Sequence, residues 1–273
     1  MLFSVIIPLY NKAEYIRQTV ETVLRQSFSD FEIIIVNDGS TDNSVEVVNS
    51  IKDNRINLYS KENEGVSIAR NYGISLSKGE YITFLDADDE WHEDFLKNMH
   101  DLIQHYPKNA FYTTATILNR EGKHQIITHK KQRGECFEIE DYCWDRTFTR
   151  INLCAVGSVC IKKDLLDRVG GFPVGVKYGE DLDLWLRLAC ITKLVYSNKP
   201  YFTYNITTLN NTATNYRDKN FVFPYWKWYD YKYSKKLSLY LFATRQILGE
   251  MKDALSAKKF SDFWFYLKKI RLF

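Results

Sequence analysis

Residues 3–8 (FSVIIP), 31–37 (FEIIIVN), 56–60 (INLYS) and 81–85 (YITFL) are four short runs rich in β-branched and aromatic side chains. Stretches with the periodicity of helices separate them, a rhythm typical of βαβ units that build a parallel sheet. The second run is apolar without alternation, as expected of a strand buried on both faces. The pattern predicts an α/β fold whose Rossmann-like sheet is mixed but mainly parallel and is flanked by helices.

Helices are predicted between these strands. Asn11 is placed to cap the first one, and residues 66–77 form the third, which is expected to end at Gly79 in the left-handed conformation. Farther along, the pattern predicts a strand over 153–161 and a helix over 180–190. The apolar positions of the first two helices recur on one face of each: Ile16, Val20, Val23 and Leu24, then Val45, Val48 and Ile51.

Composition excludes several classes of protein. A net charge of +3 over 273 residues is too balanced for a general nucleic-acid binder, so no nucleic-acid partner is expected. The chain has neither a long apolar run nor a signal-peptide pattern, which predicts a cytoplasmic protein. Its five cysteines are odd in number and lack a Cys-x-x-Cys pair, which predicts reduced, mostly buried thiols rather than disulfides or a zinc site.

Acidic side chains follow the predicted strands where ligands bind in parallel sheets, beyond the carboxyl ends. Asp86 and Asp88 follow the fourth strand, and neither a G-x-G-x-x-G motif nor a P-loop occurs. Mg²⁺ or Mn²⁺ is usually held by one or two carboxylates together with the phosphates of the substrate. These two aspartates therefore suit a metal site, although D-x-D is also common in solvated turns that precede a helix.

Two further residues allow both a functional and a plain structural interpretation. Asp38 stands in an Asp-Gly pair, which favours a simple turn, yet its carboxylate could also accept the ring N–H of a pyrimidine or guanine. Arg70 taken alone is a surface cation, but an arginine beside a diphosphate forms bidentate hydrogen bonds.

Five motifs carry a resemblance to a known family. VIIPLYN, IIIVNDGSTD, NEGVSIARNYG, YITFLDADD and GEDLDLWLRL occur in that order over residues 3–205. Together they resemble the family 2 glycosyltransferases of GT-A fold, which are inverting enzymes that use nucleotide sugars. The resemblance implies a transferase of hexosyl type that uses Mn²⁺ or Mg²⁺. A sugar-nucleotide pyrophosphorylase and a noncatalytic nucleotide-sugar-binding or scaffold protein are the alternatives.

The resemblance also implies roles for individual residues. Asp38 would contact the base, Asp88 and Asp86 would bind the metal, and the pair Glu180 and Asp181 would supply the catalytic base, with Asp181 as the preferred residue. Acidic charge at a helix N-terminus also explains that pair. The residues expected to bind the nucleotide are Pro8, Tyr10, Asn11, Asp38, Gly65, Arg70, Asp86 and Ala87. Thr207 stands where many relatives carry a histidine near the diphosphate.

The resemblance suggests three regions. Residues 1–105 would bind the nucleotide sugar, and residues 106–216 would hold the catalytic base and a glycan or lipid-linked acceptor of surface polysaccharide or lipooligosaccharide synthesis. Residues 217–273 read as a helical extension rich in aromatic and basic side chains. Such a composition suits the inner face of a membrane, and equally suits packing on the catalytic domain or in a homo-oligomer.

Overall fold

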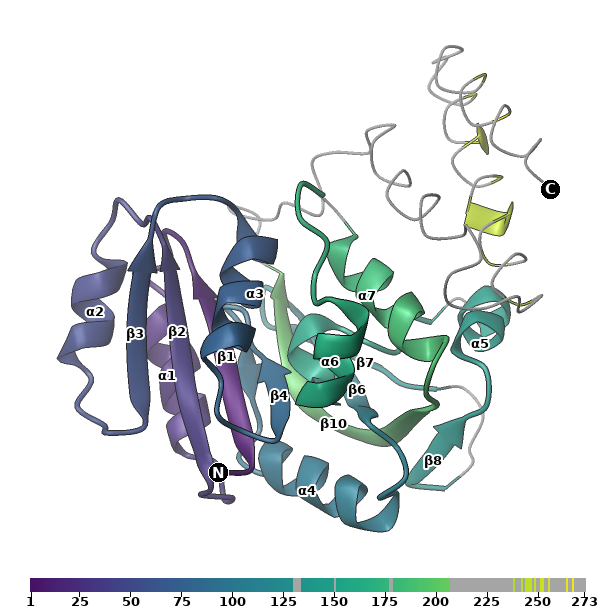
Figure 1. Ribbon diagram of the computed structural model, residues 1–273, viewed down its shortest axis with the longest axis horizontal. Coiled ribbons are helices and arrows are strands. Elements are labelled where there is room, and N and C mark those ends of the chain that lie inside the picture. The colour runs from purple at the N-terminus through teal and green to yellow at the C-terminus, as the bar shows by residue number, and fades with distance from the viewer. Residues whose placement is uncertain are drawn as a thin grey trace.

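The computed structural model describes residues 1–129, 134–149, 151–176 and 179–206, together with single positions between 238 and 267. Its ten strands form one mixed sheet in the order β3-β2-β1-β4-β9-β6-β10-β5, with β7 paired to β6 and β8 paired to β10 (Figure 1). The strands are β1 (Phe3–Leu9), β2 (Phe31–Asp38), β3 (Ile56–Lys61), β4 (Tyr81–Phe84), β5 (Glu90–Trp91), β6 (Phe111–Arg120), β7 (Lys123–Ile127), β8 (Cys136–Ile139), β9 (Val159–Lys162) and β10 (Leu194–Ile206).

The N-terminal half of the sheet, strands β3, β2, β1 and β4, is entirely parallel. β9 joins β4 and β6 in antiparallel pairs, and β10 then runs parallel to β6. We call β9, β6, β10 and β5 the C-terminal half. The helices are α1 (Ile16–Leu24), α2 (Ser44–Ser50), α3 (Val66–Leu76), α4 (Phe95–His105), α5 (Tyr142–Thr149), α6 (Lys163–Val169) and α7 (Glu180–Ala189), with a short 3₁₀ turn, η1, at Val156–Ser158.

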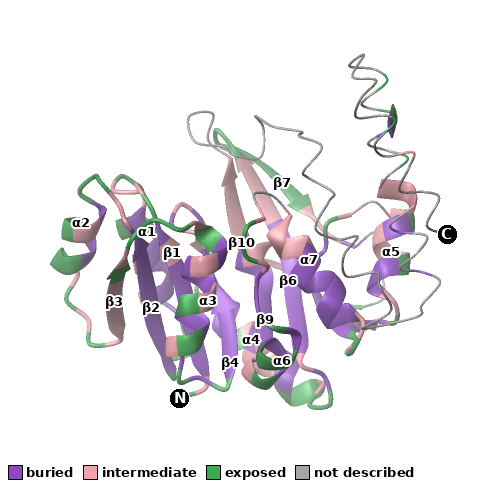
Figure 2. Ribbon diagram, turned by 45° about the horizontal axis from the view of Figure 1, so that its top comes forward, coloured by how far each residue is buried: buried purple, intermediate pink, exposed green. Residues whose placement is uncertain are grey.

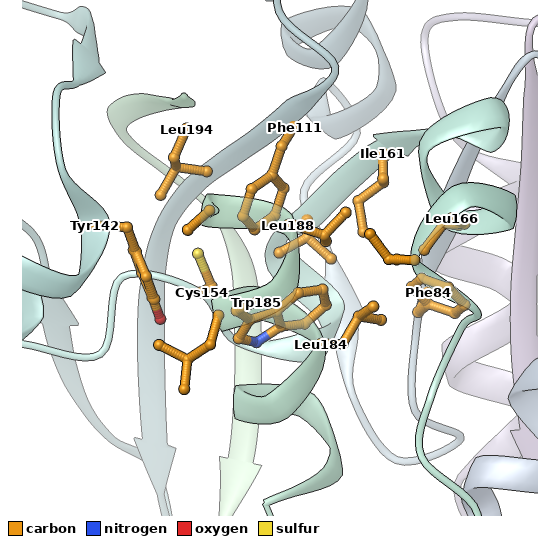
Figure 3. Close-up of a cluster of buried hydrophobic side chains, with 14 of the residues drawn as sticks. Phe84, Phe111, Tyr142, Cys154, Ile161, Leu166, Leu184, Trp185, Leu188 and Leu194 are labelled. Carbon is orange, nitrogen blue, oxygen red and sulfur yellow. The ribbon is translucent and has the colours of Figure 1, made fainter. Parts of the chain in front are cut away.

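Apolar side chains cover both faces of the sheet. In β1, Val5 and Ile7 belong to one buried cluster, which includes residues of α1 and α4, while Ile6 belongs to the opposite cluster with residues of α3, α6 and α7. Figure 2 shows β1, β2 and β4 buried along almost their whole length. Trp185 of α7 lies at the centre of the second cluster, near Phe111 and Leu184 (Figure 3). The predicted burial of the second strand on both faces is confirmed, since every residue of β2 is buried.

Two predictions about the ends of helices are wrong. α1 begins at Ile16 without a side-chain cap, and Asn11 instead adopts a left-handed φ of 51° while its carboxamide oxygen accepts the N–H of Thr41. Gly79 is not among the residues with positive φ. It packs so closely on β1 that a Cβ there would lie 2.6 Å from the backbone of Phe3.

The strand predicted over 153–161 is shorter than expected. It begins only at Val159, because the hydroxyl of Ser158 accepts the N–H of Ala155 at 3.0 Å and closes the turn η1. The thiol prediction is confirmed, since all five cysteines are free and three of them are buried. Most of residues 217–273, including Trp226 and Trp228, lie outside the described residues. Of the described residues in this segment, Met251 is buried in the core, whereas Leu248 and Leu255 are exposed.

Candidate active site

The candidate residues of the N-terminal half gather where β1, β2 and β4 end. The loop after β1 is tied to the loop after β2, because the N–H of Asn11 donates to Ser40 Oγ at 3.1 Å and the N–H of Thr41 donates back to Asn11 Oδ1 at 2.8 Å. Tyr10 is 46% exposed beside this junction, while Ala87 is buried in the core. The parallel register places these loops at one edge of the sheet, as predicted.

Asp38 ends β2, and its carboxylate is engaged by protein donors. It accepts hydrogen bonds from Lys61 Nζ at 2.7 Å, from the N–H of Glu64 at 3.1 Å and from the N–H of Gly65 at 2.8 Å. Gly65 has a φ of 95°, which favours glycine, and it stands directly before α3. Asp38 therefore fastens the loop between β3 and α3 to the end of β2.

Arg70 joins the two halves of the molecule. Its side chain is 3% exposed, and its two terminal nitrogens donate to Asp86 Oδ1 at 2.7 Å and to Glu180 Oε1 at 2.9 Å. The guanidinium also lies over the ring of Phe172, 5.1 Å from the centroid. Burial by itself lowers the pKa of Arg70, but the two carboxylates outweigh it and raise the pKa above its usual value. The arginine is thus a permanently charged bridge rather than a surface cation.

Asp88 lies beside a residue that sequence reasoning missed. Lys12 Nζ is 2.6 Å from Asp88 Oδ2, and both side chains are about one-fifth exposed, at 19% and 22%. The sequence contained a signal for this pair, because Lys12 directly follows Asn11 at the same edge of the sheet. Its partner, 76 residues away, could not be read from the chain.

Asp89 is a second missed residue, and its contacts hold the acidic loop in place. Its carboxylate accepts the N–H of Asn205 in β10 at 2.9 Å, and its carbonyl accepts the hydroxyl of Thr19 at 2.9 Å. Burial, followed by the charges of Asp86 and Asp88, raises the pKa of Asp89 well above its usual value. Asp89 therefore anchors the loop between α1 and β10 instead of facing a ligand.

Glu180 and Asp181 begin α7. Gly179 precedes them with a φ of 75°, and Glu180 accepts the hydrogen bond from Arg70. Asp181 keeps some exposure to solvent, yet burial and then the neighbouring charge of Glu180 raise its pKa to about 6. A carboxylate with such a pKa can accept a proton near neutral pH. The acidic pair also complements the helix N-terminus, so both sequence interpretations apply.

The pKa of Tyr204 in β10 responds to acids from both halves of the sheet. Burial, followed by the charges of Asp89, Asp86, Asp88 and Asp181, raises the pKa of its hydroxyl to about 12. The candidate metal ligands and the candidate base therefore act on the same side chain, although they come from loops almost a hundred residues apart.

Asp86 and Asp88 are the candidate ligands for a divalent cation. Among the described residues, no group of three or more His, Cys, Asp or Glu side chains could hold a metal ion. Asp86 and Asp88 each have a cationic partner, and Thr207 lies outside the described residues. Asp88 is partly exposed, and one such carboxylate together with substrate phosphates is a set that Mg²⁺ and Mn²⁺ accept. The site fits a cation that arrives with its substrate.

No described helix is long and apolar enough to span a membrane.

The chain is similar in sequence to proteins of one known family. Residues 4–166 match the model of the family described as Glycosyl transferase family 2. Glycosyltransferase GlyG of Streptococcus pneumoniae is 42% identical over 214 residues, which cover 74% of this chain and 70% of GlyG. An uncharacterized glycosyltransferase of Rickettsia bellii is 32% identical over 215 residues, and there the match covers 78% of this chain but only 30% of the longer protein.

Solved structures give a likeness in fold. The crystal structure of S. aureus TarS 1-349 in complex with UDP-GlcNAc superposes with a TM-score of 0.79 at 19% identity, covering 98% of this chain and 80% of that one. The complex of the same protein with UDP gives a TM-score of 0.66 at 20% identity, over 91% of this chain and 66% of the other.

Proposed function

The chain belongs to the family 2 glycosyltransferases, and on that basis we propose that it transfers a sugar from a nucleoside diphosphate to a hydroxyl of a glycan or lipid-linked acceptor. The observation that carries the proposal is the bridge made by Arg70. It brings Asp86, at the end of β4, and Glu180, at the start of α7, to the same guanidinium. The bridge supports a donor site at the end of β4 that would lie beside the proposed base, Asp181, which follows Glu180 in the chain.

Asp181 is the proposed base. An acceptor hydroxyl is a weak nucleophile at neutral pH, and a carboxylate that takes its proton during attack accelerates the reaction about 10²–10⁴-fold. The raised pKa of Asp181, about 6, keeps it ionised at pH 7 while making it a better proton acceptor than an exposed aspartate. A single displacement with this base inverts the anomeric configuration.

The donor is proposed to lie at the ends of β1, β2 and β4. Asp38 and Gly65 would contact the nucleoside, with Pro8, Tyr10, Asn11 and Ala87 around it. Asp88, with Asp86 nearby, would hold Mn²⁺ or Mg²⁺ together with the donor phosphates. Such a cation neutralises the charge that develops on the leaving diphosphate. Uracil is the preferred base of the donor, because the TarS structure of the same fold was solved with UDP-GlcNAc.

A donor screen tests the proposal. Thermal unfolding is measured with UDP-, GDP- and dTDP-sugars in the presence of Mn²⁺, and stabilisation by one class identifies the base. If none of the donors stabilises the protein, the proposal is contradicted. Hydrolysis of the bound donor, compared with a chelator control, then separates an enzyme from a noncatalytic nucleotide-sugar-binding protein.

The remaining parts of the proposal concern the regions. Residues 1–105 would serve the donor, residues 106–216 the acceptor and the base, and residues 217–273 a membrane surface that carries a lipid-linked acceptor for polysaccharide or lipooligosaccharide synthesis. Flotation of the full chain with anionic and with neutral liposomes tests the membrane contact. Basic, aromatic segments favour anionic lipid, so equal and negligible flotation with both would contradict it.

A further inference from the structure

Hydrogen bonds of its backbone fix the position of Lys12. Its N–H donates to Ser44 Oγ at 2.9 Å, and its carbonyl accepts the N–H groups of Tyr15 at 3.0 Å and Ile16 at 2.9 Å. The backbone of Lys12 is thus held between the end of β1 and the start of α1. Its long side chain is the movable part, and it reaches across to Asp88.

The partner of Lys12 is the proposed metal ligand. An ammonium 2.6 Å from Asp88 Oδ2 already neutralises the carboxylate to which a divalent cation would bind. Both charges retain contact with solvent, and ion pairs of that kind contribute little net stability, so the pair can open at small cost. Lysine also presents a compact charge on a flexible stem, which can change partners.

Arg70, unlike Lys12, cannot change its partners at small cost. Its guanidinium is buried and already donates to Asp86 and Glu180, so turning toward a diphosphate would leave two carboxylates without their cation. Lys12 would release only one partly exposed carboxylate, which an arriving metal ion would neutralise. Of these two cations, Lys12 is therefore the one that can turn to the phosphates.

We propose that Lys12 is an exchangeable counter-ion of the donor site, a role that rests on the proposed function. In the free enzyme it neutralises Asp88. When a divalent cation binds together with the donor, Asp88 passes to the metal and the ammonium of Lys12 turns to the phosphate oxygens of the donor. Lys12 then competes with the metal in the absence of nucleotide and supports nucleotide binding in its presence.

Removal of the Lys12 ammonium should have opposite effects on the binding of Mn²⁺ and of UDP, and this contrast tests the role. In Lys12→Met, Mn²⁺ binding to the nucleotide-free enzyme, followed by electron paramagnetic resonance, is expected to tighten about twofold to fivefold because the competitor is gone. Binding of UDP with Mn²⁺, followed by calorimetry, is expected to weaken about tenfold because a charge-assisted contact is lost. A damaged fold would weaken both. Lys12→Arg should restore UDP binding in part.

Matched controls separate this inference from the proposed function. Lys97→Met removes an exposed lysine that pairs with Asp101, and both affinities should stay unchanged. In the background of Asp88→Asn, Lys12→Met should no longer tighten Mn²⁺ binding. If the wild-type enzyme binds UDP with Mn²⁺ and Lys12→Met binds both ligands equally well, the role of Lys12 is wrong. If the wild-type enzyme binds no nucleoside diphosphate, the proposed function itself fails.

Discussion

The two halves of the sheet contribute to the site in different ways. In the N-terminal half, parallel strands that follow one another along the chain end at one edge, so each loop delivers its polar residue to the same place. In the C-terminal half, strands distant in sequence pair in both directions, and the acidic residues come from the start of α7. The comparison indicates that the first half gathers its candidate residues locally, while those of the second half are brought to them by specific contacts such as the Arg70 bridge.

The largest expected effect comes from the C-terminal half alone. Asp181→Asn should lower the rate of sugar transfer about 10²–10⁴-fold, because no carboxylate remains to take the proton of the acceptor hydroxyl. Nucleotide binding should be largely retained, since the proposed donor residues lie in the other half. Initial rates and calorimetry with UDP and Mn²⁺ measure the two. Asp167→Asn, on the exposed side of α6, is the matched control, and a fully active Asp181→Asn would remove this residue from the role of base.

The next effect concerns the bridge between the halves. Arg70→Met leaves Asp86 and Glu180 without their shared cation, and removing one partner of a buried ion pair costs about 3 kcal/mol of unfolding free energy. Urea denaturation measures the loss. Arg17→Met, which removes a half-exposed arginine beside Glu21, should change stability by less than about 1 kcal/mol. Equal stability of both variants would show that Arg70 does not hold the halves together.

The difference between the halves also explains what the sequence could predict. All four strands of the N-terminal half were placed to within one residue, because β-branched runs between helical stretches are local signals. The family and its GT-A fold were recognised from ordered motifs and are confirmed. The strand at 153–161 was overestimated, because the hydroxyl of Ser158 closes a turn that apolar composition does not reveal.

The sequence predicted candidate residues for the site but not their contacts. Asp86 and Asp88 became candidates because acidic groups follow a strand, and Asp181 because of the family resemblance. Their partners were not found, since the pairing of Lys12 with Asp88 spans 76 residues and that of Asp89 with Asn205 spans 116. Such contacts depend on the register of the whole sheet, and no local pattern encodes them.

Packing against β10, in the C-terminal half, gives a smaller effect. A Cβ on Gly157 would lie 2.1 Å from the ring of Phe202, so Gly157→Ala should reduce the unfolding free energy by about 1–3 kcal/mol. In the N-terminal half, Gly73→Ala would meet the side chain of Ile6 at 2.5 Å, but alanine gains about 1 kcal/mol of helix propensity there. Thermal unfolding compares the two variants. A larger loss for Gly73→Ala would place the less tolerant packing in the N-terminal half.

The smallest effect is a shift in pH dependence. The value of kcat/KM should rise with pH through about 6 as Asp181 loses its proton. Glu180→Gln removes the like charge that contributes to the raised pKa, so the inflection should move to lower pH by about one unit or less. Rates from pH 4.5 to 8 measure this shift. An unchanged inflection in Glu180→Gln would mean that burial alone sets the pKa of Asp181.

Stability provides an independent check on the same group. The pKa of Asp181 is higher in the folded chain, about 6, than the ordinary 3.8, so the folded state binds the proton more tightly. Its contribution to stability is therefore fully present below about pH 4 and is lost as the pH rises through 6. Asp181→Asn should flatten this part of the stability profile relative to Asp167→Asn. If the profile does not flatten, the carboxylate of Asp181 is better solvated than its surroundings indicate. Its pKa would then be raised only when the bound acceptor excludes water.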